Sequence, residues 1–427
     1  MNRSIFTGIL AVLATVAAFA QSGTNSPYSQ YGIGLLTDQS QGFNRGMNGV
    51  GLALRRGNVV NTLNPASYSA VDSLTMIFDV GLSGQMTNFK EGSTRVNASN
   101  ADFEYFASTF RLRRHVGMSF GLLPYSNVGY EYSTSTYLDA TNGSIAESYS
   151  GSGGLHQAFL GIGWRVMKPL SVGVNAAYLW GTLNRSVSSG ATTTINSLSK
   201  VYTTTVNNYD LEFGLQWNQP VGKKDDVTLG ATVGIGHKLG ADPTCEIINI
   251  NSTVSESDTT SLVAHNGLEL PMTYGVGLAW NHNEKWVVAA DFTMQQWGSV
   301  DLPAYDSQTN TYAQRPGLTM DRYKVNLGAD YVPAAMSRRL VDRIHYRLGA
   351  GYATPYYKIN GQDGPKELSV SAGLGIPLQN AWSNRSVLNI SAQWARTSAK
   401  DLIVENTFRI NIGLTFNERW FAKWRID

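Results

Sequence analysis

Several features that many proteins depend on are scarce in this sequence of 427 residues. It has one cysteine, Cys245, which leaves no disulfide framework and no thiolate metal cluster. Only 15% of residues are charged, and 33 Lys and Arg nearly balance 31 Asp and Glu, so no basic excess is available to neutralise nucleic-acid phosphates. After residue 20, no apolar run approaches the roughly 18 residues of a membrane-spanning helix. These absences exclude a disulfide-stapled domain, a nucleic-acid partner and a helical membrane protein.

Motifs for catalysis and cofactor binding are also missing. The sequence contains no G-x-S-x-G elbow, no H-E-x-x-H and no P-loop. The six histidines are scattered without ligand spacing, and Gly-x-Gly pairs such as Gly234 and Gly236 open no helix. We therefore predict no catalytic residue, no metal site and no cofactor. The enzymatic alternative is a lipase or protease of the outer membrane.

The first 20 residues, MNRSIFTGILAVLATVAAFA, have the three parts of a secretory signal peptide. Arg3 stands before an apolar stretch, and Ala-Phe-Ala at 18–20 precedes Gln21 as a cleavage site. The alternative is a short buried helix. No cysteine follows the cleavage site, so a lipoprotein is not expected. The segment 1–20 predicts an exported protein.

From about residue 74 onward, apolar residues alternate with small or polar ones. Over 408–416, every second residue is Phe, Ile or Leu, with Arg, Asn, Gly and Thr between them. A period of two places each set on one face of a β-strand. The pattern predicts strands at 75–89, 101–113, 116–136, 155–166, 170–187, 206–219, 226–239, 268–281, 286–299, 320–333, 342–357, 366–378, 386–397 and 403–418.

The lengths and spacing of these 14 segments favour a membrane barrel over a soluble sandwich. Most exceed the roughly 9–11 residues with which a tilted strand crosses a bilayer. Short turns such as 114–115 alternate with long connections, which we expect to be solvated loops. The long connections are 90–100, 137–154, 188–205, 240–267, 300–319 and 358–365. We predict an all-β fold, a 14-stranded antiparallel transmembrane β-barrel at 75–418, in a bacterial outer membrane.

The barrel prediction also indicates on which side of the membrane the chain ends lie and which side chains face the lipid or the lumen. An even strand count puts both termini on the short-turn, periplasmic side, including a C-terminal tail at 419–427. Aromatic residues near strand ends suit the interfacial girdles of membrane proteins. They are Trp164, Tyr178, Trp180, Trp217, Trp280, Trp286, Trp297 and Trp394. Charged residues with apolar neighbours are expected on the lumen face, and they include Arg165, Glu212, Asp291, Arg322, Lys324, Asp330, Arg347, Glu405 and Arg409.

Residues 21–74 do not alternate and are rich in Gly, Asn and Ser. A barrel of this size leaves a lumen that such a segment can fill. A disordered periplasmic tail is the alternative, but apolar residues such as Met47, Val50 and Leu52 are too numerous for a solvated tail. We predict an N-terminal hatch, or plug, at 21–74 inside the lumen.

Short motifs along the mature chain support this arrangement. Gly-Val-Gly-Leu-Ala at 49–53, followed by Asn64, Pro65 and Ala66, resembles the hatch of the outer-membrane long-chain fatty-acid transporter family (FadL type), which includes aromatic-hydrocarbon channels. Leu-Glu-Leu-Pro at 268–271 and the stretch at 321–328 are also similar to that family. The resemblance implies a hatch-plugged barrel for passive uptake of hydrophobic small molecules, such as long-chain fatty acids or hydrocarbons, with a lateral exit.

The resemblance also implies site residues, each with a structural alternative. Pro124 lies inside the third predicted strand, where a proline cannot donate to the ladder and marks either a lateral opening or a simple bend. The Asn-Pro-Ala motif is either a family element or a tight turn. Arg55, Arg56, Arg347 and Arg409 are candidates for ligand head groups, because guanidinium binds carboxylate in a bidentate manner. The alternative is that they pair with other polar residues and pack the hatch.

Two functional classes follow. The first is a channel whose partners are a hydrophobic small molecule or lipid and the outer-membrane lipid. The second is a non-transporting barrel that serves as a structural or accessory subunit of an outer-membrane protein complex. The unusual Ser-Pro-Tyr-Ser-Gln-Tyr stretch at 26–31 and the aromatic, basic tail after Phe416 depart from the family pattern and support the second class.

Overall fold

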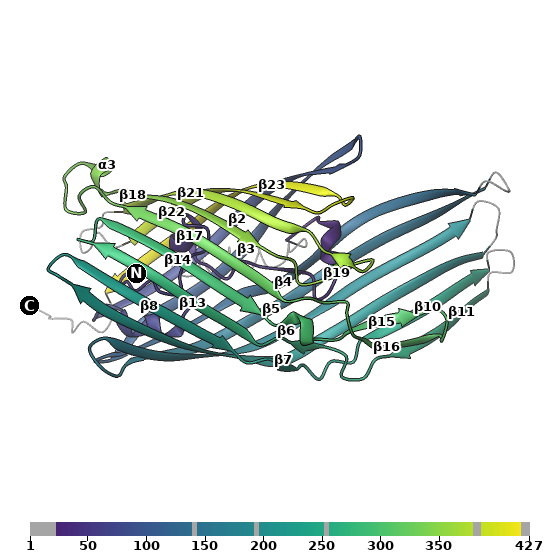
Figure 1. Ribbon diagram of the computed structural model, residues 1–427, viewed down its shortest axis with the longest axis horizontal. Helices are drawn as coiled ribbons and strands as arrows, with labels where there is room; N and C mark the ends of the chain where they lie inside the picture. Colours follow the sequence, from purple (N-terminus) through teal and green to yellow (C-terminus); the bar gives the residue numbers. More distant parts are fainter. Residues whose placement is uncertain (1–22, 139–142, 192–195, 252–255, 379–385, 420–427) are drawn as a thin grey trace, which may run out of the picture.

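The computed structural model describes residues 23–138, 143–191, 196–251, 256–378 and 386–419. The predicted signal peptide, and the predicted tail beyond Arg419, lie outside the described residues. One antiparallel sheet of 17 strands dominates the fold. Without β1, β10 and β11, which are additions to it, the sheet has 14 strands, and it closes into a barrel because β2 pairs with β23 (Figure 1). The predicted 14-stranded antiparallel barrel is confirmed.

The barrel strands follow one another in chain order, each paired with the next. They are β2 (Thr75–Glu91), β3 (Thr94–Arg113), β4 (Val116–Leu138), β5 (Gly143–Arg165), β6 (Leu170–Ala191), β7 (Asn196–Val221), β8 (Asp225–Gly234), β13 (Thr273–His282), β14 (Trp286–Gln295), β17 (Arg322–Tyr331), β18 (His345–Ala353), β21 (Lys366–Leu378), β22 (Ser386–Ser398) and β23 (Val404–Arg419).

Short elements complete the described chain. They are the 3-10 helices η1 (Pro27–Gln30), η2 (Pro65–Ala70) and η3 (Trp297–Ser299), the helices α2 (Gly42–Arg45) and α3 (Leu340–Arg343), and the strands β1 (Leu35–Leu36), β9 (His237–Lys238), β10 (Thr244–Asn251), β11 (Glu256–Val263), β12 (Glu269–Leu270), β15 (Leu302–Asp306), β16 (Thr311–Arg315), β19 (Lys358–Ile359) and β20 (Gln362–Asp363). No helix in the described ranges has the length and apolar character needed to cross a membrane.

Alternation along the strands separates an apolar outer surface from a polar inner one. In β17, Leu327 is 55% exposed on the outside, whereas Asn326 beside it is 5% exposed and faces inward. Trp164, Trp217, Trp280 and Trp286 are exposed on the outer surface, as expected of girdle residues. Trp297 is not a girdle residue, because η3 turns it inward, where it is fully buried beside Tyr356.

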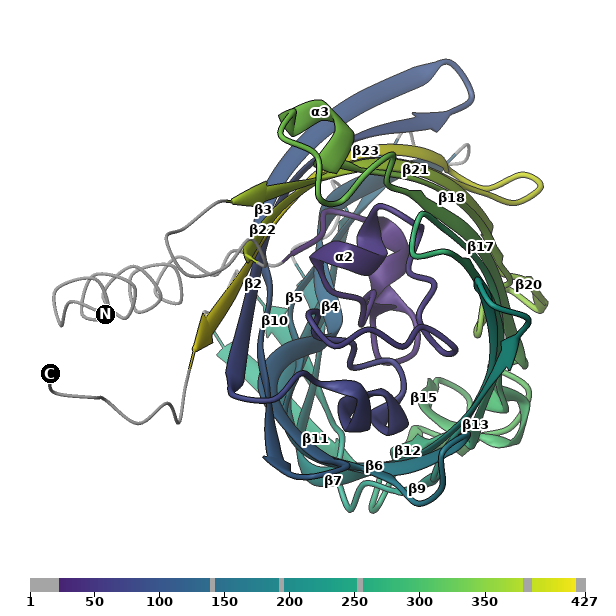
Figure 2. The ribbon, with the colours of Figure 1, turned by 90° about the vertical axis from the view of Figure 1, so that its left-hand side faces the viewer.

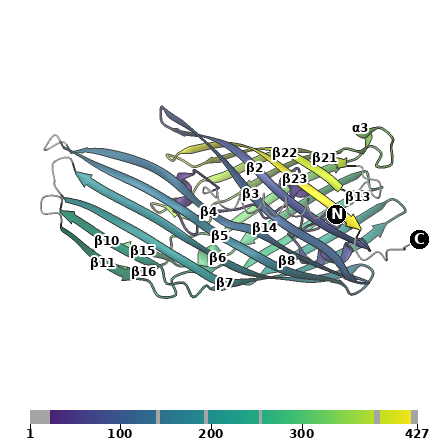
Figure 3. The same ribbon diagram turned by 180° about the vertical axis from the view of Figure 1, so that it is seen from behind.

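Several predicted loops are strands, which corrects the expectation of solvated loops. β4 to β7 run 22–26 residues and project beyond the neighbouring strands at one end of the barrel (Figures 1 and 3). β10 and β11 form a hairpin within 240–267, and β10 pairs with the first residues of β7. Ser, Thr and Asn predominate in these stretches, so the alternation that revealed the membrane strands is weak in them, although Cys245 and Ile247 of β10 lie in a small buried apolar cluster. We call this the projecting end and the opposite one the short-turn end.

The N-terminal residues 23–74, here called the inner segment, lie inside the barrel (Figure 2). Phe43, Met47 and Val50 are buried against barrel residues Ala279, Val287 and Ala289. A second cluster packs Val60, Tyr68 and Val71 against β2 to β6. The inner segment has little regular structure, and its backbone polar groups bond partly to one another and partly to wall side chains such as Tyr105, Asp291 and Gln216.

Candidate functional site

The Asn-Pro-Ala motif anchors the inner segment to the wall. Asn64 is the N-cap of η2, and its side-chain oxygen accepts a hydrogen bond from the Ala66 N–H at 3.0 Å. Its amide donates to the carbonyl oxygens of Leu52 at 2.8 Å and Leu215 at 3.1 Å. Pro65 suits the first turn of a helix, because the N–H groups of that turn have no acceptor within the helix and the N–H that proline lacks is therefore not needed. Asn64, fully buried, therefore joins two parts of the inner segment to β7.

Replacing Asn64 with alanine is expected to lower the free energy of unfolding by about 1–3 kcal/mol, because it removes the cap and the bonds that the amide donates. Aspartate restores the cap acceptor but not the donors, so Asn64→Asp should not recover the loss. The measurement is urea unfolding of the detergent-extracted protein followed by tryptophan fluorescence. Asn97→Ala, at an exposed position, is the control and should stay within about 0.5 kcal/mol of the parent. Equal losses at both positions would contradict the anchoring role.

A buried ion network holds another part of the inner segment. Asp330, on β17, accepts hydrogen bonds from Arg56 at 2.7 Å and from Arg347 at 3.1 Å. The two guanidinium groups also lie over the ring of Phe43, at 4.7 Å and 4.5 Å from its centroid. His345 contacts the same carboxylate at 3.0 Å. Two of the four candidate head-group arginines therefore bind a carboxylate of the protein itself.

The other two candidate arginines lie apart from this network. Arg55 donates to Ser171 at 2.7 Å and to Ser69 at 3.2 Å. Burial, together with nearby Arg165, lowers the pKa of Arg55 to about 10. Arg409 donates twice to Gln85, at 3.0 Å and 2.7 Å, and lines a cavity. Among the candidates, only Arg409 combines a cavity position with no carboxylate among its hydrogen-bond partners within the described residues.

The wall is interrupted beside Pro124. The pairing of β3 with β4 begins at Arg113 opposite Val116 and ends at Phe106 opposite Leu122. Toward the projecting end beyond that pair, the described residues of β3 and β4 do not pair with each other. The register of β4 against β5 shifts between Pro124 and Ser126, as at a β-bulge. In Figure 3 the β2–β3 hairpin diverges from β4 above this point. Pro124 therefore lies just beyond the last β3–β4 pair and beside the register shift of β4 against β5.

The inner segment itself occupies the foot of this opening. β1 pairs with β4, with Leu35 opposite Asn127 and Leu36 opposite Ser126. Thr37 donates through its hydroxyl to the Pro124 carbonyl oxygen at 2.6 Å. Gly23 packs between Asp102 of β3 and Asn127 of β4. Residues of this chain thus cover the lower part of the β4 edge that β3 leaves unpaired, next to Pro124.

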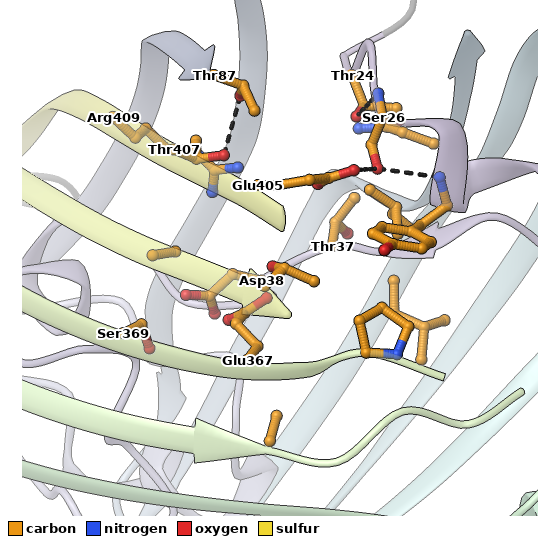
Figure 4. Close-up of a pocket in the computed structure, with 18 of the residues that line it drawn as sticks. Thr24, Ser26, Thr37, Asp38, Thr87, Glu367, Ser369, Glu405, Thr407 and Arg409 are labelled. Atoms are coloured by element: carbon orange, nitrogen blue, oxygen red, sulfur yellow. Dashed lines mark hydrogen bonds between the residues drawn. The ribbon is translucent and has the colours of Figure 1, made fainter. Parts of the chain in front are cut away.

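Two cavities remain between the inner segment and the wall, of about 210 Å³ and 230 Å³. Both are lined by Thr37, Asp38, Arg322 and Lys324. Figure 4 shows the first, where the carboxylates of Asp38, Glu367 and Glu405 and the side chain of Arg409 surround one space. The pKa of Asp38 is lowered to about 2, since Lys324, Arg45 and Ser40 outweigh its burial. The second cavity adds apolar residues such as Leu63 and Phe159.

The sequence analysis did not predict that charged lumen residues bind the inner segment. Asp291, which alternation placed on the lumen face, accepts hydrogen bonds from the backbone N–H groups of Gly51 at 2.6 Å and Leu52 at 2.9 Å. Asp330 lies directly opposite Arg347 in the β17–β18 register. Two inward residues of opposite charge on consecutive predicted strands were a signal for that pair. Nothing in the alternation could have placed Phe43 between two arginines.

Solved structures share this fold. The Ralstonia pickettii toluene transporter TbuX is 15% identical, with a TM-score of 0.62 over 90% of this chain and 99% of that one. The Pseudomonas putida toluene transporter TodX is 16% identical, with a TM-score of 0.62 over 89% and 98%. A Pseudomonas aeruginosa FadL homologue is 12% identical, with a TM-score of 0.61 over 90% and 99%. The resemblance to the FadL type is therefore confirmed as a likeness of fold.

Comparison at the level of sequence gives a different family. A family model described as BamG matches residues 1–427, the full length of the chain. No curated protein matches the sequence. The named structural neighbours are transporters and a homologue of one, not enzymes.

Proposed function

The chain belongs to the BamG family, and from that premise and the filled lumen we propose that it serves as a structural or accessory subunit of an outer-membrane protein complex. One observation carries the proposal: both cavities described above contain the charged side chains of Asp38, Arg322 and Lys324, so neither is a purely apolar pocket. A hydrophobic molecule entering them would have to desolvate carboxylates and guanidinium groups, which is costly.

The inner segment supports the same proposal. Asn64, Asp291 and Asp330 bind it to three different parts of the wall, and its strand β1 covers the foot of the β3–β4 opening. We propose that residues 21–74 act as a permanent plug, with residues 75–418 as the membrane domain. Moving the plug would require breaking several buried polar contacts together, each of which costs free energy when left unpaired.

The proposed site is the outer membrane, with the short-turn end and both termini in the periplasm. The apolar outer surface and the exposed tryptophans support membrane insertion. The projecting end, where β4 to β7 and the β10–β11 hairpin extend beyond the other strands, then faces the cell exterior. In outer-membrane barrels, short turns face the periplasm and long loops face outward.

Purification of the tagged full-length chain from its own outer membrane tests the subunit role. We expect one or more outer-membrane proteins to co-purify in a fixed ratio in mild detergent, as measured by quantitative mass spectrometry. As a control, the same tag is placed on an unrelated barrel protein of the same membrane, and the proteins that co-purify with it define the background. Recovery of the chain alone, with bound acyl lipids or hydrocarbons, would contradict the proposal.

Passive uptake of hydrophobic small molecules is the second candidate, because β3 and β4 stop pairing next to Pro124 and the fold resembles that of toluene transporters. Under this candidate, Pro124 marks a lateral exit and Arg409, with Arg55, Arg56 and Arg347, contacts a ligand head group. Uptake of labelled oleate and toluene by cells with and without the gene distinguishes the two candidates. We expect equal uptake; a severalfold loss on deletion, restored by the wild-type gene, would favour transport.

A further inference from the structure

The projecting part of β4 has a strand neighbour on one side only. β4 pairs with β5 along its whole length, up to Leu138 opposite Gly143. On its other side β3 ends its pairing at Leu122, and β1 covers only Ser126 and Asn127. Figures 1 and 3 show β4 continuing well past the β2–β3 hairpin on that side. The described residues therefore include a long open strand edge.

The backbone groups that face this edge can be identified. The Tyr125 carbonyl oxygen accepts a hydrogen bond from the Thr37 N–H at 3.1 Å, and the Gly129 N–H donates to the Ser29 hydroxyl at 3.1 Å. Both contacts lie on the open side. In an antiparallel ladder, alternate residues point their N–H and C=O groups to the same side. Glu131, Ser133 and Ser135 thus present their backbone groups to the open edge, and no described strand pairs with them there.

This edge lacks the usual protection against pairing. Natural edges carry lysine, proline or a bulge, or are covered by another element. Residues 129–138 read Gly-Tyr-Glu-Tyr-Ser-Thr-Ser-Thr-Tyr-Leu, with no proline, no lysine and Glu131 as the one charged residue. Tyrosine and threonine favour extended strands. Such an edge is suited to accept a further strand.

The chain already uses the lower part of this edge in that way. Leu35 and Leu36 of β1 add an antiparallel strand at Asn127 and Ser126. Beyond β1 the chain passes through buried Ile33 to η1, where the Ser29 hydroxyl accepts a hydrogen bond from the Gly129 N–H at 3.1 Å and Gln30 accepts one from the Tyr132 hydroxyl at 3.0 Å. η1 therefore contacts β4 as far as Tyr132, and beyond it no described strand pairs with the open side of Ser133 and Ser135.

We propose that the β4 edge at 131–137 receives an extended strand from a different protein of the assembly, as a β-strand addition. This inference rests on the proposed subunit role. On the inner face, Tyr132 stacks with Tyr149 at 4.9 Å, which suits aromatic or apolar residues at alternate positions of the incoming strand. On the outer face, exposed Glu131 suits a basic residue. A second copy of this chain is disfavoured, since it would bring two Glu131 carboxylates to one seam.

Proline substitution tests the edge with little disturbance of the barrel. A proline at Ser133 or Ser135 removes an N–H that faces the open side, so the β4–β5 ladder keeps its bonds. The double variant Ser133→Pro/Ser135→Pro is compared with Ser133→Ala/Ser135→Ala in the full-length chain. Each carries p-benzoylphenylalanine in place of the exposed Thr134, which leaves Tyr132 intact, for photo-cross-linking in intact cells. Retention of the heat-resistant barrel band on gels confirms that each variant is folded.

We expect a cross-link from the parent and the alanine variant to one other outer-membrane protein, and a yield lower by roughly tenfold or more in the proline variant. An unchanged yield in the proline variant overturns the inference. So does an adduct of twice the chain mass, which would identify a second copy. Co-purification of partners without any cross-link also overturns it while leaving the subunit role intact, whereas absence of all partners from the parent contradicts the subunit role itself.

Discussion

Replacing Asp330 with alanine is expected to lower the free energy of unfolding by about 3–5 kcal/mol, because it leaves the buried Arg347 guanidinium and the half-buried Arg56 guanidinium without their carboxylate. The Asp330 side chain is fully buried, and that of Arg347 is 2% exposed. Arg56 reaches the same carboxylate from the inner segment, so the loss should also loosen the plug. The measurement is urea unfolding in detergent, with limited proteolysis at intermediate urea to detect early release of residues 23–74.

An exposed ion pair provides the control for Asp330. Asp306 of β15 pairs with Arg315 of β16, and their side chains are 24% and 46% exposed. Solvent screens such a pair, so Asp306→Ala should cost far less stability than Asp330→Ala. A cost at Asp330 no greater than that at Asp306 would show that the buried network does not hold the inner segment to the wall.

Alternation located every barrel strand, because each membrane-crossing strand must place an apolar row against lipid. The predicted segment 366–378 coincides with β21, and 386–397 lies within one residue of β22. Agreement is weaker at strand ends: the predicted segment 226–239 runs past the end of β8 at Gly234, and 268–281 begins before β13 at Thr273. The predicted third strand ended near 136 and the fourth began at 155, whereas β4 and β5 continue to 138 and start at 143. The stretch 137–154 is rich in Ser and Gly, so period two carries little hydrophobic signal there.

The interior could be predicted in kind but not in detail. Apolar residues at 47–63 indicated that the N-terminal segment is packed, and they are buried as clusters. The contacts that fix the segment depend on long-range register, which alternation cannot supply. Asn64 reaches Leu215 across 151 positions, and Gly51 reaches Asp291 across 240. Sequence analysis therefore identified arginines in the lumen, but not that Arg56 and Arg347 share one carboxylate of the wall.

Adding methyl groups at two wall glycines is expected to displace the inner segment. A Cβ at Gly230 of β8 would overlap the Leu52 carbonyl group, and a Cβ at Gly349 of β18 would overlap the backbone of Met47. These neighbours are backbone atoms, which cannot rotate away as a flexible side chain can. Overpacking of this kind costs about 1–3 kcal/mol at each site, so Gly230→Ala/Gly349→Ala should lose about 2–6 kcal/mol. Urea unfolding measures the loss, and protease cleavage within 23–74 reports displacement.

Gly84→Ala is the matched control for both substitutions. Gly84 is also a barrel glycine, on β2, but a Cβ there meets nothing within 4 Å. Its stability should stay within about 0.5 kcal/mol of the parent, and its inner segment should resist protease as the parent does. The comparison separates contact with the inner segment from the general cost of changing a strand glycine. If all three positions behaved alike, the wall would tolerate a loosely held segment, and the permanent plug on which the subunit role depends would lose its support.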